Sequence, residues 1–147
     1  MASELTCSIP RSRLLSGLTN LRFVVLLVTT LILIGLSGCR SAPIHDVDNR
    51  PIPPGASLSE VSRAIQAAGN SLGWVMQETR PGLIVGTLFV RDHMAKVEIP
   101  YSKRSYSIRY AASSNLDYDA TKQTIHSNYL GWITNLDNQI RGRLSVL

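Results

Sequence analysis

The chain has 147 residues, with 15 Lys and Arg against 10 Asp and Glu, a formal net charge of +5 and only two cysteines. This length supports one domain with a modest hydrophobic core and not two. The basic residues are scattered along the chain, so they indicate a solvated surface and do not favour a nucleic-acid-binding protein.

An uncharged apolar run covers residues 23–36 and follows Arg11, Arg13 and Arg22. A basic segment followed by such a run is typical of a bacterial export signal. As a helix the run would be about 21 Å long at about 1.5 Å per residue, whereas the hydrocarbon core of a bilayer is about 30 Å thick. The run is therefore predicted to be an export signal, because as a helix it is shorter than the hydrocarbon core that a membrane span must cross.

The apolar run ends on Leu36, Ser37, Gly38 and Cys39. These residues resemble the lipobox, the recognition sequence of bacterial lipoproteins. The resemblance implies that the chain is cut after Gly38, that a diacylglycerol is attached to the Cys39 thiol and that the new amino terminus is acylated. Several acyl chains on one residue anchor a protein stably, so a membrane is one predicted partner. The alternative is an uncleaved signal-anchor helix with an incidental cysteine.

Arg40 follows the acylated position, where lipoproteins kept in the inner membrane typically carry Asp. By that resemblance we expect the outer membrane, with the domain facing the periplasm; the periplasmic side of the inner membrane is the alternative. Such a domain rarely meets nucleic acid. Cleavage also removes Cys7, and Cys39 would carry lipid, so the mature part is predicted to have no disulfide.

The mature chain is predicted to have two parts. Residues 39–56 hold the acylated end and four prolines, which favour an extended tether that keeps the domain some tens of ångströms from the bilayer. In the alternative, Ile44, Val47 and Ile52 pack on the domain as an N-terminal arm. Residues 57–147 are predicted to form one periplasmic α+β domain.

Two helices flank four strands in the predicted domain. Ser57 and Glu60 form a capping-box pattern, and the apolar spacing after them predicts a helix over 58–72 that ends at Gly73. An apolar stripe at helical spacing predicts a last helix over about 122–142, with Asp137 among the residues turned to solvent. The strands between the helices are predicted over 74–79, 83–90, 94–99 and 106–111, followed by a loop over 112–119.

The order α-β-β-β-β-α, with short turns between the strands, predicts a particular α+β fold. We expect a two-layer sandwich, an antiparallel four-stranded meander with the N- and C-terminal helices on one face. The other face of the sheet carries Lys96, Glu98, Ser107 and Arg109 and is expected to be exposed to solvent.

Four further segments carry a second resemblance: 72–74, 90–95, 114–118 and 129–136. Through them most of residues 58–140 is similar to a group of small, uncharacterised proteobacterial lipoproteins. The group has no established activity, so the resemblance implies membership of a lipoprotein family without implying a reaction.

Residues able to do acid-base or metal chemistry do not form a recognisable pattern. Asp92 and His93 could form a carboxylate-imidazole pair, but neighbouring residues in a strand point to opposite faces, so a turn histidine is favoured. His45, His93 and His126 lack the short ligand spacings of a metal site. Residues 113–115 carry no nucleophile-elbow pattern. The sequence therefore predicts no enzyme, no cofactor and no metal.

A binding surface is the remaining candidate for function. Basic residues of the last two predicted strands and their turn, and polar residues of the loop after them, could contact another envelope component. These residues are Lys96, Arg104, Arg109, Asn115 and Tyr118. The first hypothesis is a lipid-anchored bacterial envelope lipoprotein that acts as a non-enzymatic periplasmic interaction or structural module, with an envelope protein as partner.

Two other hypotheses stay open. One is a small-ligand carrier or sensor with an aromatic pocket between sheet and helix. Its lining would come from Trp74, Tyr106, Tyr110, Tyr129 and Trp132. The other is an unrecognised hydrolase, which requires Asp92, His93 and Asn115 to converge in one cleft.

Overall fold

The structure, a computed structural model, describes residues 41–147. This part of the chain contains two helices, an antiparallel sheet of five strands and an antiparallel sheet of two strands. The predicted α+β class is confirmed. The predicted export signal and Cys39 lie outside the described residues.

Helix α2, Leu58–Ser71, begins where the sequence predicts and ends one residue earlier than predicted. The Ser57 N–H donates to the Glu60 carboxylate over 2.8 Å, and the Glu60 N–H donates back to the Ser57 hydroxyl, which completes the capping box. At the other end Gly73 has φ of 84°, and Gly73 and Trp74 donate to the carbonyls of Asn70 and Gly69. This is the Schellman pattern that glycine favours.

Four strands follow one another in the large sheet in chain order. They are β3 (Val75–Arg80), β4 (Leu83–Val90), β5 (His93–Pro100) and β6 (Ser105–Ser114). The turn between β3 and β4 is Pro81–Gly82, with Gly82 at φ of 88° as a Pro-Gly turn requires. Strand β6 is longer than predicted, because residues 112–114 continue the pairing with β5.

Residues 41–56 are not a free tether, and this corrects the prediction. Strand β1 (Ser41–Pro43) pairs with β7 (Thr124–His126), and β2 (Val47–Pro51) pairs with β6 as a fifth strand at the edge of the large sheet. Ile52 and Ala56 are buried, and Ile44 and Val47 pack against the core. Burial of these apolar side chains and pairing of an otherwise open edge of β6 hold the segment down. The alternative prediction, an N-terminal arm, is the correct one, and residues 41–147 belong to one compact unit.

The last helix also begins later than predicted. Helix α3 spans Asn128–Leu144, because residues 124–126 form β7. The Ile125 side chain, assigned to the helical stripe from the sequence, is fully buried in this strand. A strand this short depends on its partner β1, more than 80 residues earlier in the chain, so local spacing gives no sign of it.

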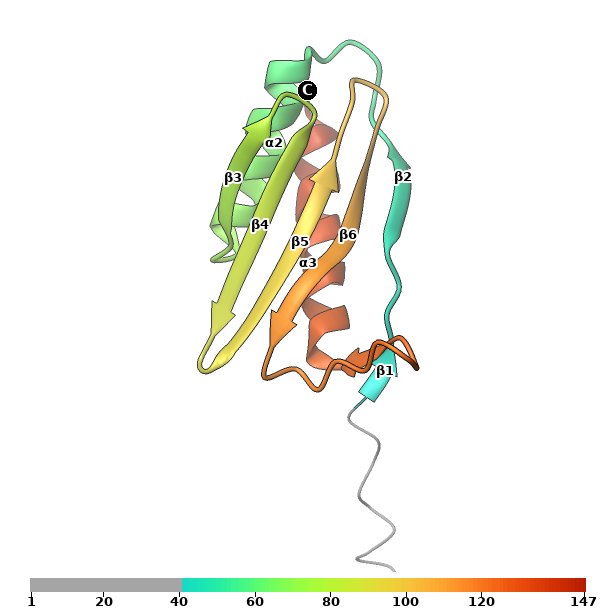
Figure 1. Cartoon of the computed structure of the whole chain (residues 1–147). Helices are drawn as coiled ribbons and strands as arrows, with labels where there is room; N and C mark the ends of the chain where they lie inside the picture. The colour runs from blue at the N-terminus through green and yellow to red at the C-terminus, as the bar shows by residue number, and fades with distance from the viewer. Residues whose placement is uncertain (1–40) are drawn as a thin grey trace, which may run out of the picture. The chain divides into compact units, whose positions relative to one another are not determined.

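The core lies between the large sheet and the two helices, which Figure 1 shows on the same side of the sheet. Met76 packs where Gly69 of α2 and Gly86 of β4 leave room for it: a Cβ at either glycine would meet the Met76 sulfur at 3.0 Å or less. Ser107, predicted on the exposed face, is instead buried. It lies under the arm, where its hydroxyl accepts the Asn49 N–H over 3.0 Å.

Candidate functional site

The face of the large sheet turned away from the helices is the first candidate surface. Burial alternates along β4 and β5, and cross-strand register places the exposed residues of neighbouring strands side by side. We call this surface the open face and define it by Val75, Gln77, Val85, Thr87, Phe89, Met94, Lys96, Glu98 and Arg109. Val75 is 63% exposed and Phe89 66% exposed. With the partly exposed Val85 and Met94 they form an apolar patch on this face, and such a patch is typical of a surface that another molecule covers.

The five predicted surface residues do not form one site. Lys96 and Arg109 lie on the open face, where Arg109 pairs across the strands with Glu98. Arg104 lies in the turn before β6, whereas Asn115 and Tyr118 follow the other end of that strand. The Tyr118 ring packs against Tyr110 in a tilted arrangement with 4.6 Å between ring centroids, so part of the ring serves packing. The structure therefore keeps Lys96 and Arg109 together and separates them from the other three.

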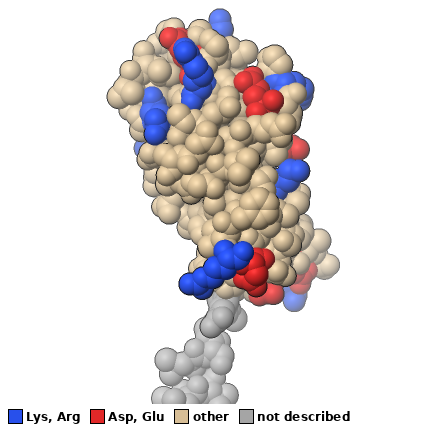
Figure 2. Space-filling model, turned by 90° about the vertical axis from the view of Figure 1, so that its left-hand side faces the viewer, with Lys and Arg blue, Asp and Glu red and all other residues tan. Residues whose placement is uncertain are grey.

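Strand β3 forms a free edge beside the open face. Within residues 41–147 it pairs only with β4, so its outer backbone groups have no strand partner. Figure 2 looks at this side of the molecule and shows acidic and basic side chains gathered toward the two ends, with uncharged surface between them. An edge strand with unpaired backbone groups and few nearby charges is a template on which another chain can add a strand.

Asp92, His93 and Asn115 do converge, but mainly through backbone atoms. His93 Nδ1 lies 2.6 Å from the Asn115 carbonyl oxygen, which can only accept, so Nδ1 donates. The Asn115 side-chain amide donates to the Asp92 carbonyl, and the Asp92 carboxylate is 3.6 Å from His93 Nε2, too long for a hydrogen bond. In the described chain no hydroxyl is bonded to His93. The hydrogen bonds of this cluster thus tie the β4–β5 turn to the end of β6.

A hollow of about 560 Å³ lies between α2 and the β3 end of the sheet, and Ser62, Glu78 and Tyr101 are among its lining residues. Ser62 and Tyr101 each donate a hydroxyl hydrogen bond of 2.6 Å to the Glu78 carboxylate. The Ser62 bond, then the Tyr101 bond, lower the pKa of Glu78 from its usual 4.5. A carboxylate held in its charged form is a weak base, and both of its oxygens already accept hydrogen bonds, which does not favour acid-base catalysis at Glu78.

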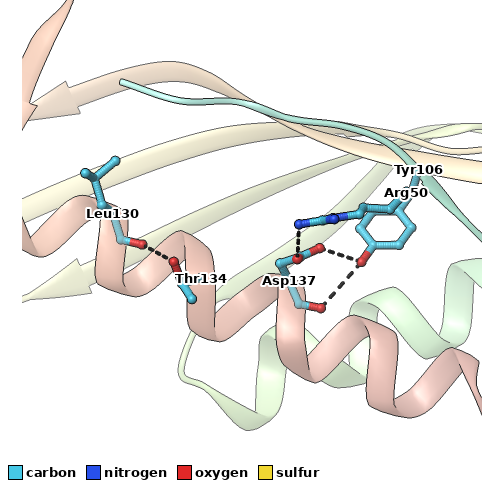
Figure 3. Close-up of polar contacts among 5 residues, drawn as sticks. All are labelled: Arg50, Tyr106, Leu130, Thr134 and Asp137. Carbon is cyan, nitrogen blue, oxygen red and sulfur yellow. Dashed lines mark hydrogen bonds and ion pairs between the residues drawn. The ribbon is translucent and has the colours of Figure 1, made fainter. Parts of the chain in front are cut away.

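A buried carboxylate links the three elements α3, β6 and β2 (Figure 3). Asp137 of α3 has a side chain only 6% exposed, and it accepts the Tyr106 hydroxyl over 2.7 Å and lies 3.1 Å from the Arg50 guanidinium. Burial, and then the bond to Asp137, raise the pKa of the Tyr106 hydroxyl well above its usual 10.0. Tyr106 therefore stays neutral and donates, and Asp137 binds β2 and β6 to α3.

Sequence reasoning missed both Arg50 and Asp137. Arg50 was placed on the tether and Asp137 among the solvent-facing residues of the last helix. The spacing of the last helix does indicate that Asp137 is buried, because Asp137 follows Ile133 by four residues and precedes Ile140 by three. A residue at those intervals shares the buried side of the helix. An acidic residue there needs a partner, and the partner comes from the arm.

The aromatic residues predicted to line a ligand pocket belong mostly to the core. Trp74, Tyr106 and Tyr129 are buried, and Tyr110 and Trp132 pack against that core. Tyr110 meets Tyr129 edge to face, with 5.8 Å between ring centroids. These side chains fill the space between sheet and helices and serve stability.

The lipobox residues Leu36, Ser37, Gly38 and Cys39 lie outside the described residues. Among residues 41–147 no helix is both long and apolar enough to cross a bilayer. Nor does that part of the chain group three or more His, Cys, Asp or Glu side chains as a metal ion would require.

No protein-family model, curated protein or solved structure matches this chain.

Proposed function

We propose that the protein is a bacterial envelope lipoprotein, anchored by lipid on Cys39, whose domain acts as a non-enzymatic interaction module in the periplasm. The lipobox resemblance supports the anchor, and Arg40 favours the outer membrane, with the inner membrane as the alternative. The proposed protein partner is another envelope component. In this proposal the fold is a two-layer sandwich, in which strands β3–β6 form a meander and helices α2 and α3 cover one face of it.

The observation that carries the proposal is the exposure of Val75 and Phe89 on the open face. Both residues are large and apolar, and register places Val75 opposite Thr87, two residues before Phe89 on the same face of β4. Lys96, Glu98 and Arg109 beside them supply both signs of charge. A patch of apolar side chains with a charged rim is the usual composition of a protein-protein interface.

In-cell photo-crosslinking tests this proposal. A photoreactive amino acid at Phe89, Lys96 or Arg109 should give one shared adduct, identified by mass spectrometry as an envelope protein. Asn135 is the matched control, because it is exposed on α3, and this helix covers the face of the sheet opposite the open face (Figure 1). Confining the lipid-anchored domain to a membrane raises its effective concentration near a partner, so the adduct should weaken when Cys39 is replaced by Ser.

The change Arg109→Glu should weaken the adduct at Phe89, because it reverses the charge at the rim of the same face. Adducts at Asn135 equal to those at Phe89, or no protein adduct at any open-face position, would contradict an interaction module on this face.

A further inference from the structure

The N-terminal arm, residues 41–52, is bonded to the domain along its length. Its first strand pairs with β7, and the Ile44 N–H donates to the Gln123 carbonyl over 2.9 Å. Further along, Asp46 accepts the Tyr110 N–H over 3.0 Å, and the Ile52 N–H donates to the Arg104 carbonyl over 2.8 Å. The arm is therefore part of the folded domain.

Arg50 ties the arm to α3 as well. Detaching the arm would leave the Asp137 carboxylate buried without its cation and would expose Ile52, which is 7% exposed in the fold. A buried charge without a partner is strongly unfavourable, and so is exposure of a core side chain. The arm can extend into a tether only if the Asp137 carboxylate loses its cation and Ile52 becomes exposed.

Very little chain remains between the arm and the proposed lipid. Arg40 is the single residue between Cys39 and Ser41, the first residue of β1. Two residues of extended chain span at most about 7 Å, whereas a released arm would add about 40 Å at about 3.3 Å per residue. An acylated Cys39 must therefore lie close to β1.

The surroundings of β1 form one continuous end of the domain, which we call the anchor end: residues 41–43, 91–93 and 115–126. Ser41 pairs with His126, whose ring stacks on His93 with 6.4 Å between centroids, and His93 contacts Asn115. Figure 1 shows β1, the β4–β5 turn and the end of β6 together at the lower end of the molecule. The turn between β5 and β6, which holds Lys103, lies at the opposite end.

We propose that the mature domain stands directly on the lipid surface, with its anchor end against the headgroups and the bound arm as a rigid support. This inference rests on the proposed acylation of Cys39. Strand β6 runs from the far end to the anchor end over Ser105–Ser114, about 34 Å at about 3.4 Å per residue. The whole open face then lies within that distance of the bilayer, and its partner is an envelope component that reaches the same zone.

The charges of the anchor end do not themselves attract a membrane. Arg91 is accompanied by Asp92, and Lys122 forms an ion pair of 3.2 Å with Asp119. A surface of mixed sign lacks the clustered basic residues that bind anionic lipid. The acyl chains alone therefore hold this end at the surface, so the contact should persist at high salt and should vanish in Cys39→Ser.

Site-specific quenching tests the orientation. The predicted mature chain has no cysteine other than Cys39, so Lys122→Cys or Lys103→Cys introduces one thiol for a fluorophore. The probes are matched, since both lysines are exposed and lie in connecting segments at opposite ends of the domain. The acylated protein is placed in phosphatidylcholine vesicles whose headgroups carry a nitroxide. We expect several-fold stronger quenching at position 122 than at position 103.

A spacer variant makes the test independent of any loss of folding. A flexible Gly-Ser segment as long as the arm, inserted between Arg40 and Ser41, leaves the folded residues unchanged and should lower quenching at position 122 to nearly the value at 103. Equal quenching at both positions in the acylated protein, or an unchanged signal with the spacer, overturns the orientation and leaves the lipoprotein proposal standing. Absence of acylation, read from the intact mass, overturns both.

Discussion

Asp137 is the residue on which the position of the arm depends most. It is buried, and its two charge-assisted contacts come from different elements, Arg50 of β2 and Tyr106 of β6. A second ion pair between arm and domain, Arg109 with Asp48 at 4.0 Å, is exposed on both sides. The first pair joins the arm to α3 and the second joins it to β6, and they differ in solvation, so comparing them tests the effect of burial.

We expect Arg50→Gln to lower the free energy of unfolding by about 2–3 kcal/mol, because it leaves a buried carboxylate with one hydrogen bond and no cation. The cost stays below that of a fully buried pair, since Arg50 is 46% exposed and water replaces part of the interaction. Arg109→Gln, the matched change at the exposed pair, should cost under about 1 kcal/mol. Urea denaturation of the purified variants measures both. Equal costs would mean that burial of Asp137 is not what holds the arm.

Glu78 gives a prediction for pH dependence. Its pKa is lowered in the folded protein, first by Ser62 and then by Tyr101, so it adds stability above its unfolded pKa of about 4.5 that is lost as the pH falls through the folded value. Ser62→Ala should raise the Glu78 pKa toward 4.5, and Tyr101→Phe should raise it by less. Carboxyl NMR titration reads this pKa directly. A Glu78 pKa unchanged in Ser62→Ala would show that the hydroxyl does not stabilise the carboxylate.

The contact of α2 with the sheet depends on small residues that leave room for the Met76 side chain. A Cβ on Gly86 would meet the Met76 sulfur at 3.0 Å, Val97 at 3.2 Å and Trp74 at 3.3 Å. These neighbours come from β3, from β5 and from the residue just before β3, so the added methyl group has no free direction. Gly131 offers the opposite case, because it lies within α3, and an added Cβ there would have no atom within 4 Å apart from its chain neighbours and the adjacent backbone of its own helix.

The same substitution should therefore have opposite effects at the two glycines. Gly86→Ala is expected to lower the free energy of unfolding by about 1–3 kcal/mol through overpacking. Gly131→Ala should raise it by about 0.5–1 kcal/mol, because alanine loses less conformational entropy in a helix. Thermal and urea unfolding measure both, and a stabilising Gly86→Ala would mean that the α2 contact is looser than the structure indicates.

Elements with strong local patterns were predictable from the sequence, whereas elements that depend on distant partners were not. Capping residues and apolar spacing predicted α2 to within one residue, and alternation with turn residues predicted β3–β6. By contrast, β1, β2 and β7 are short and carry no pattern of their own, because each forms by pairing with a strand far away in the chain. Because residues 124–126 pair with β1, helix α3 starts at Asn128 and not at the predicted position of about 122.

For the whole molecule, the candidate surface was predictable only in part. Alternation along β5 and β6 placed Lys96 and Arg109 on the exposed face, and the structure agrees. The run over 83–90 is apolar at nearly every position, so no alternation along it marks Phe89 as exposed. Whether one face of a central strand is covered depends on where the helices lie, which no local pattern specifies.

The proposed interaction module and the proposed orientation of the domain both depend on the lipid anchor. The most direct measurement is the mass of the N-terminal peptide from protein purified from bacterial membranes. We predict a chain that begins at Cys39 and carries a thioether-linked diacylglycerol and an acylated amino terminus. Cys7→Ser, the matched control, should leave this peptide unchanged, and Cys39→Ser should abolish it. A membrane-bound chain that retains residues 1–38 with an unmodified Cys39 would contradict the account.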